Sequence, residues 1–186
     1  MEILFLEKLA KSGFSRTKAF NEIVELEKEF FPKYYYNLKD IRKFCKQSNG
    51  STLILLDKNK VIGYLIPLLF RNKDYLQILT VAVNKNHQKK GYGTKLIRKC
   101  EEIAKSLKLK RIIIRAENSY TILKTLKNLK YKPMGLKEIN EFKDDCVFDV
   151  DDKIEKISNL FSNACLITKN IGKKNPFSFI PMIKYI

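Results

Sequence analysis

Two glycines and three lysines lie close together in the middle of the chain, in the segment 87–97 (HQKKGYGTKLI). An apolar run precedes this segment, and an amphipathic helical pattern follows it. A helix start leaves its first backbone N–H groups without intrahelical acceptors, and the helix dipole adds partial positive charge there. Gly91 and Gly93 would let the backbone approach an anion, and Lys89 and Lys90 add charge. The segment therefore predicts a phosphate site, although a solvated strand-to-helix turn would have the same composition.

Several common ligand-binding patterns are missing from the chain. The segment lacks the GxxxxGK[ST] pattern, and no third glycine completes the GxGxxG of dinucleotide-binding folds. The four cysteines are far apart and form no CxxC pair, namely Cys45, Cys100, Cys146 and Cys165. This spacing favours reduced structural thiols over a metal site, so no metal is expected.

Apolar patterns before the loop predict the elements that position it. Short β-rich runs bounded by turn residues are typical of strands, and apolar residues at helical spacing are typical of amphipathic helices. These patterns predict a strand and turn at 2–9, helices at 16–31 and 38–48, a hairpin at 51–70 and a strand at 74–83. Pro32 ends the first helix, and the polar turn of the hairpin is Asp57–Lys60.

After the loop, one helical stripe is formed by Leu96, Ile97, Cys100, Ile103, Ala104 and Leu107. The remaining patterns predict a strand at 110–117, a helix at 122–129, strands at 131–142, 165–171 and 179–186, and a helix at 149–161. A strand, the loop, a helix and the next strand predict a parallel βαβ crossover, whereas the front half predicts an antiparallel meander. The sequence thus predicts a mixed α/β fold with a mostly antiparallel central sheet.

Four residues at the loop follow the pattern V-x-x-x-x-[QR]-x-x-G-x-[GA], namely Val83, Gln88, Gly91 and Gly93. Together with the preceding strand and the following helix, this segment resembles the acyl-CoA-binding signature of the GNAT superfamily of N-acetyltransferases. The predicted order of elements in residues 2–135 is also similar to that family's order. The resemblance implies a single N-acetyltransferase domain spanning 1–186, with an insertion at 137–175 near the substrate side.

The resemblance identifies the expected anion as the pyrophosphate of coenzyme A, with acetyl-CoA as co-substrate. It implies that the backbone of 81–83 pairs with the pantetheine arm like an added strand, while 88–94 wraps the pyrophosphate. An asparagine after the next strand often contacts the pantetheine in this family. The implied cofactor-binding residues are Val81, Ala82, Val83, Gln88, Lys89, Lys90, Gly91, Tyr92, Gly93, Thr94 and Asn118.

Acetyl transfer to an amine requires a proton acceptor, a donor to the oxyanion and release of a thiolate. Many members of the family carry a tyrosine acid in the last helix and a glutamate base on the fourth strand. In this chain a Thr-Leu pair stands at the first position, and the predicted fourth strand contains no glutamate. Glu117 and Tyr120 are the candidate catalytic residues that remain. His87, the one histidine, is expected to be a surface loop residue.

An aromatic segment, FFPKYYYNLKDI at 30–41, follows the first predicted helix. Aromatic clusters of this kind usually belong to a core or an interface. The segment also resembles the F-P-x-x-Y loop of protein N-terminal acetyltransferases, which lines the groove for a peptide N-terminus. On that resemblance, Phe31, Pro32 and Tyr35 are the expected substrate-binding residues.

The chain carries 37 Lys and Arg against 20 Asp and Glu, a formal net charge of +17. This charge suits an anionic ligand and disfavours polycationic amines, so a peptide or protein amine is the expected acceptor. A small-molecule amine remains an alternative, as does a non-catalytic basic module that binds nucleic acid. The start of the chain does not resemble a signal peptide, and no apolar stretch has the length of a membrane span. A cytoplasmic protein is therefore expected, with its oligomeric state left open.

Overall fold

A computed structural model describes residues 1–32, 35–117, 120–142 and 179–186 of the 186-residue chain. These residues form two compact units, one of Met1–Ile112 with Ile186 and one within Ile113–Tyr185. Within the described ranges, no helix combines the length and the apolar character needed to cross a membrane. The prediction of a single domain with an insertion stays a prediction.

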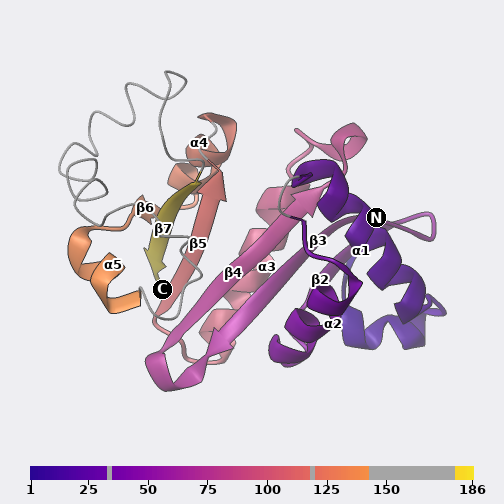
Figure 1. Cartoon of the computed structure of the whole chain (residues 1–186), viewed down its shortest axis with the longest axis horizontal. Helices are drawn as coiled ribbons and strands as arrows, with labels where there is room; N and C mark the ends of the chain where they lie inside the picture. Colours follow the sequence, from indigo (N-terminus) through magenta and orange to yellow (C-terminus); the bar gives the residue numbers. More distant parts are fainter. Residues whose placement is uncertain (33–34, 118–119, 143–178) are drawn as a thin grey trace. The chain divides into compact units, whose positions relative to one another are not determined.

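The first unit contains a meander of four antiparallel strands (Figure 1). In sheet order they are β1 (Glu2–Phe5), β2 (Leu53–Asp57), β3 (Lys60–Phe70) and β4 (Tyr75–Val83). The hairpin between β2 and β3 turns through Lys58 and Asn59, whose φ values of 44° and 61° suit the twist of a two-residue hairpin. The predicted hairpin and meander are confirmed.

Helices cover both faces of this meander. Helices α1 (Arg16–Phe30) and α2 (Leu38–Gln47) lie on one face, and α3 (Tyr92–Ser106) lies behind the sheet in Figure 1. The core under α1 and α2 is built from alternate strand residues, including Ile54, Tyr64, Ile66 and Ala82. On α3, the predicted stripe is buried at Leu96, Ile97, Cys100 and Ala104. The packing of α3 therefore fixes the loop that precedes it.

The register of β4 on β3 contains one extra residue. Thr80 pairs with Ile66 and Ile78 pairs with Pro67, so Leu79 has no partner on β3. Such a bulge locally disrupts the ladder and bends the strand. At the other end of the pairing, Gly63 lies opposite Val83. The bulge and this glycine are the two places where the β3–β4 ladder departs from a regular one.

The predicted strand at 2–9 is only half correct. The strand ends at Phe5, and a 3-10 helix, η1, follows over Leu6–Ser12. Leu6 and Leu9 are 1% and 0% exposed, and three-residue spacing brings both side chains to one side of a 3-10 helix. Burial of these two leucines thus overrides the strand pattern.

The second unit contains β5 from Ile113 onward (whole strand Arg111–Glu117), α4 (Tyr120–Asn128), β6 (Lys132–Pro133), α5 (Leu136–Phe142) and β7 (Phe179–Tyr185). The predicted strand at 131–142 was wrong except for β6, which pairs antiparallel with β7. The carboxylate of Glu138 accepts from the N–H of Gly135 at 2.8 Å and caps the start of α5. The predicted helix at 149–161 and strand at 165–171 lie outside the described residues. The mixed α/β class with mostly antiparallel pairing is confirmed.

We expect Gly63→Ala to destabilise the fold. A Cβ at this position would lie 3.0 Å from the carbonyl oxygen of Ala82 and 3.2 Å from Val83 Cγ2, so β3 and β4 must separate slightly. The expected loss in unfolding free energy is about 1–3 kcal/mol, measured by urea unfolding. Gly93→Ala is the matched control, because its Cβ meets nothing within 4 Å and it lies in a helix. Equal stability of the two variants would contradict the close approach at Gly63.

Candidate functional site

The glycine loop ends in the N-cap of α3. Gly91 is the N-cap residue, with φ 80° and ψ 4°, and Lys89 also has a positive φ of 60°. Within the described residues, the backbone N–H groups of 89–94 donate no hydrogen bond to protein acceptors. The first helical hydrogen bond of this region runs from Lys95 N to Gly91 O at 3.0 Å. Consecutive free N–H groups at a helix start form a site that favours an anion.

The space around this loop is open. Lys89, Lys90 and Gly91 are exposed. A Cβ added at Gly91 or Gly93 would meet nothing within 4 Å. Glycine at 91 is therefore favoured by its left-handed backbone, whereas none of the described neighbours of Gly93 requires a glycine there. A ligand has free access to the N–H groups.

Polar side chains hold the loop to the end of β4. Gln88 Nε2 donates to the carbonyl oxygen of Val83 at 3.0 Å, so this predicted cofactor residue ties the loop to the last residue of β4. The side chain of Asn84 accepts from Asn86 N at 3.1 Å and caps the short 3-10 helix η3 (Lys85–His87). His87 lies in this loop as expected, with its Nε2 3.7 Å from Oδ2 of Asp57, the last residue of β2.

The backbone of β4 presents hydrogen-bonding groups at its edge away from β3. Asn84 N donates to Ile62 O at 2.8 Å, which makes this pair a hydrogen-bonded one. Antiparallel ladders alternate between bonded and non-bonded pairs, so Ala82 directs its groups toward β3, whereas Val81 and Val83 direct theirs away. Val81 and Val83 thus have the backbone orientation that pairing with an extended arm requires, and Ala82 does not.

The predicted substrate-binding residues lie at the end of α1. Phe31 is the C-cap residue of α1, and its N–H donates to Glu27 O at 2.7 Å. Pro32 is exposed and Tyr35 is 43% exposed, so both are available to a partner. The next residue, Tyr36, stacks edge-on against Phe44 with ring centroids 4.9 Å apart. This aromatic contact anchors the segment on α2.

The sequence analysis missed a buried polar cluster centred on Glu27 of α1, which is 1% exposed. Its Oε1 accepts hydrogen bonds from Thr80 Oγ1 at 2.6 Å and from the hydroxyl of Tyr64, and its Oε2 accepts from Tyr36 N at 3.2 Å. Burial raises the pKa of Tyr64 well above its ordinary value, and the carboxylate of Glu27 raises it further, so Tyr64 remains a donor. Through Glu27, the cluster joins Tyr36 in the segment between α1 and α2 to β4 beside the bulge.

The sequence did contain a signal for Glu27. It lies four residues after Ile23 and three after Val24, on the apolar stripe of α1, where both neighbours are buried. An acid at a core-facing helical position is unusual unless its carboxylate is hydrogen-bonded. The position of Glu27 on this stripe therefore indicates a buried acid with polar partners.

The two predicted catalytic residues lie at the end of a strand and at the start of a helix. Glu117 is the last residue of β5, and Tyr120 is the first residue of α4. Asn118, the predicted pantetheine contact, lies outside the described residues. The roles of these three residues stay predictions.

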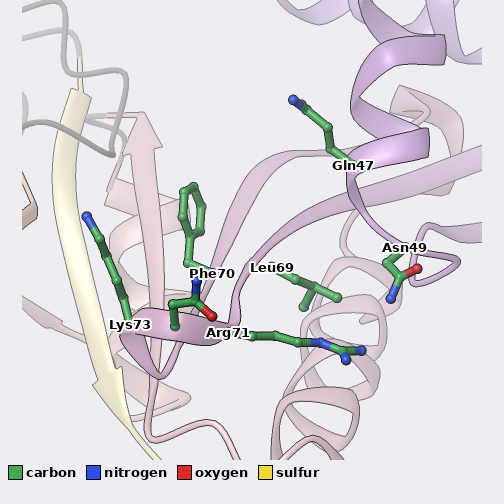
Figure 2. A pocket seen from close by; sticks show the side chains of 7 residues that line it. Gln47, Asn49, Leu69, Phe70, Arg71 and Lys73 are labelled. Carbon is green, nitrogen blue, oxygen red and sulfur yellow. The ribbon is translucent and has the colours of Figure 1, made fainter.

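A separate hollow of about 480 Å³ lies at the opposite end of the β3–β4 hairpin from the glycine loop. Its lining residues are Gln47, Asn49, Leu69, Phe70, Arg71, Asn72 and Lys73. Figure 2 shows Arg71 extending toward Asn49, with Phe70 and Lys73 directed elsewhere. Because Phe70 pairs with Tyr75 at the start of β4, this hollow is remote from Val81 and Val83 at the strand's end. It contributes nothing to the predicted cofactor site.

The fold around the glycine loop is that of an acyl-CoA-dependent N-acetyltransferase. The model of the acetyltransferase (GNAT) family matches residues 20–122, more than half of the chain. The chain therefore belongs to the GNAT family, as the sequence pattern predicted. No curated protein sequence matches it.

Solved structures share the fold at low sequence identity. Ard1 from Thermoplasma volcanium has a TM-score of 0.62 at 12% identity, with 100% of this chain and 97% of that chain covered. The ribosomal-protein-S18-alanine N-acetyltransferase from Escherichia coli has a TM-score of 0.61 at 11% identity, covering 100% and 93%. The N-acetylglutamate synthase from Neisseria gonorrhoeae, solved with coenzyme A and N-acetyl-glutamate, has a TM-score of 0.58 at 12% identity. That match covers 89% of this chain but 32% of the longer synthase.

We expect Gln88→Glu to loosen the glycine loop. The substitution removes the Nε2 donor and sets a carboxylate against the carbonyl of Val83, which should lower the unfolding free energy by about 1 kcal/mol. Urea unfolding would measure the loss. Arg98→Gln, on an exposed position of α3, changes the net charge by the same amount and serves as the control. A control that loses as much stability as Gln88→Glu would mean that charge, and not the hydrogen bond, matters.

Proposed function

We propose that this chain binds acetyl-CoA at the glycine loop and transfers its acetyl group to a primary amine of a peptide or protein. The observation that carries the proposal is the run of free backbone N–H groups at 89–94. These groups fit a pyrophosphate, because each donates to an oxygen without needing a particular side chain. Lys89 and Lys90 add positive charge at the same loop. The backbone groups of Val81 and Val83 would pair with the pantetheine arm.

Bound acetyl-CoA supplies an acetyl thioester whose thiol, with an ordinary pKa of about 8.5, leaves readily as a thiolate. The chain's own task is then to orient the amine and to remove its proton. Glu117 and Tyr120 are proposed for the proton steps on the strength of the sequence. Their positions at the end of β5 and the start of α4 are compatible with this proposal.

A peptide or protein acceptor is favoured by the chain's charge and by its surface. A chain of net charge +17 repels polycationic amines, whereas a single α-amino group meets little repulsion. Pro32 and Tyr35 are exposed beside an anchored segment and offer apolar contacts to a peptide. One structural neighbour is named as a ribosomal-protein N-acetyltransferase, a second as Ard1, and a third as N-acetylglutamate synthase. These names support protein acceptors as well as small-molecule acceptors.

Acetyl-CoA should raise the thermal midpoint of the wild-type chain far more than ATP or sulfate does. At about 100 times its dissociation constant, a ligand stabilises the folded state by about 2.7 kcal/mol. Gly91→Asp should abolish this shift, because its carboxylate repels the pyrophosphate. Gly91→Asn is the matched control, since both side chains tolerate a positive φ and differ in charge. Equal shifts with acetyl-CoA, ATP and sulfate would mean that the loop is a basic turn without a preference for acetyl-CoA.

Peptides with a free N-terminus should be better acceptors than spermidine by at least about tenfold in kcat/KM, a difference of about 1.4 kcal/mol. Mass spectrometry of the products would identify the acetylated amine, and N-terminally blocked peptides would serve as the control. Tyr35→Ala should raise KM for the peptides with little change in kcat. Faster transfer to spermidine, or no effect of Tyr35→Ala, would favour a small-molecule acceptor.

A further inference from the structure

The cluster around Glu27 contains a buried carboxylate whose described partners are all uncharged. Within the described ranges, no Lys, Arg or His lies within ion-pair distance of Glu27, although the chain carries 37 Lys and Arg. The carboxylate accepts hydrogen bonds there from Thr80, Tyr64 and Tyr36. Buried charges are ordinarily paired, so this one suits a cation or a proton that arrives from outside.

A polar side chain on β4, Gln77, lacks a hydrogen-bond donor within the described residues. Gln77 lies three residues before Thr80 and is 5% exposed. Its Oε1 has no hydrogen-bond partner within the described part of the chain. Buried acceptors normally receive a hydrogen bond. Gln77 Oε1 on β4 and the carboxylate of Glu27 beside β4 can both accept a hydrogen bond from an N–H group. A positively charged N–H group would suit both of them.

The side chains of the cluster differ in how much of each is exposed. Tyr64 is 0% exposed and Glu27 is 1% exposed, whereas Thr80 retains 7%. Thr80 directly precedes Val81, whose backbone groups are directed toward the proposed pantetheine arm. Thr80 is the member of the cluster that belongs to β4, next to the proposed pantetheine-binding edge, and its Oγ1 lies 2.6 Å from Glu27 Oε1.

We propose that Thr80 and Glu27 form the proton relay that deprotonates the acceptor amine. This inference rests on the proposed function. As the amine nitrogen bonds to the acetyl carbon and the carbon–sulfur bond breaks, one proton leaves the nitrogen. It passes to Thr80 Oγ1, which gives its own proton to Glu27 Oε1, and the sulfur leaves as the thiolate. Charge and atoms balance, because Glu27 becomes neutral as the thiolate forms.

The relay assigns distinct roles to its neighbours. Thr80 touches the reacting amine, while Glu27 acts through Thr80. Tyr64 donates to the carboxylate and holds it, but no proton passes through its hydroxyl. Gln77 Oε1 would accept a hydrogen bond from the incoming amine and help orient it. A relay of this kind supplies the base that the sequence of β4 lacks, and it takes the place of Glu117 in removing the amine proton.

The test uses the full chain with acetyl-CoA and a pool of tetrapeptides with free α-amino groups, and follows release of the coenzyme A thiol. Glu27→Gln and Thr80→Val should each lower kcat by about a hundredfold or more, with little change in KM. In both variants, the rate should keep rising with pH to about pH 9, because free amine must replace the ammonium ion. Thr80→Ser should restore most of the rate, because it keeps the hydroxyl that the relay requires.

Two controls separate a relay from a structural role. Each variant should keep the thermal shift with acetyl-CoA, which reports that the fold and the cofactor site are intact. If Glu27→Gln does not fold, the comparison of Thr80→Val with Thr80→Ser carries the test alone. The two differ in whether the hydroxyl is present, and a merely structural role would not move the pH profile.

The possible outcomes are distinguishable. Wild-type-like rates and pH profiles in Thr80→Val, or equal losses in Thr80→Val and Thr80→Ser, would overturn the relay. Failure of the wild-type chain to bind acetyl-CoA, or binding without any release of thiol to peptides, would instead overturn the proposed function. A loss in Thr80→Val that serine restores, together with the altered pH profile, would establish the relay.

Discussion

The pairing of β4 with β3 is the interaction on which the rest of the site depends. Its alternation turns the backbone of Val81 and Val83 outward while Ala82 is held by β3. The strand's last carbonyl receives the side chain of Gln88, which ties down the glycine loop. The extra residue at the bulge leaves Thr80 directed toward Glu27. The register of β4 on β3 therefore positions the outward backbone groups of Val81 and Val83, the glycine loop and the buried Glu27.

The surroundings of Glu27 determine how strongly its charge acts on a nearby group. Most of the charge of +17 lies on lysines in water, where ions and solvent screen it. Glu27 is removed from that solvent, so its charge interacts strongly with whatever comes close. Three neutral donors offset part of the cost of burying it, and none of them neutralises it. Within the described residues no lysine or arginine pairs with this carboxylate, so it retains a preference for a positive partner.

Much of the fold follows from local patterns in the sequence. The helices α1 and α2, the β2–β3 hairpin and the stripe of α3 were predicted because their periodicity and turn residues agree with their final packing. Leu6–Ser12 and 131–142 were mispredicted because tertiary burial and a Glu138 cap override the strand pattern there. The glycine loop was recognisable because its residues are contiguous. Glu27, Tyr64 and Thr80 are 37 and 16 residues apart in turn, so only folding brings them together.

This contrast also explains how a chain 11–12% identical to the three solved structures described above can carry a glycine loop that is recognisable in its sequence. Backbone N–H groups do not depend on side-chain identity, so a loop needs only a residue that tolerates φ of 80° and a helix that follows. Proton transfer, in contrast, requires a particular side chain at a particular place. A carboxylate can reach the position needed for proton transfer from a neighbouring helix as readily as from the strand itself. In this chain a buried carboxylate enters from α1, and the proposed relay uses it as the base that inspection of β4 alone does not find.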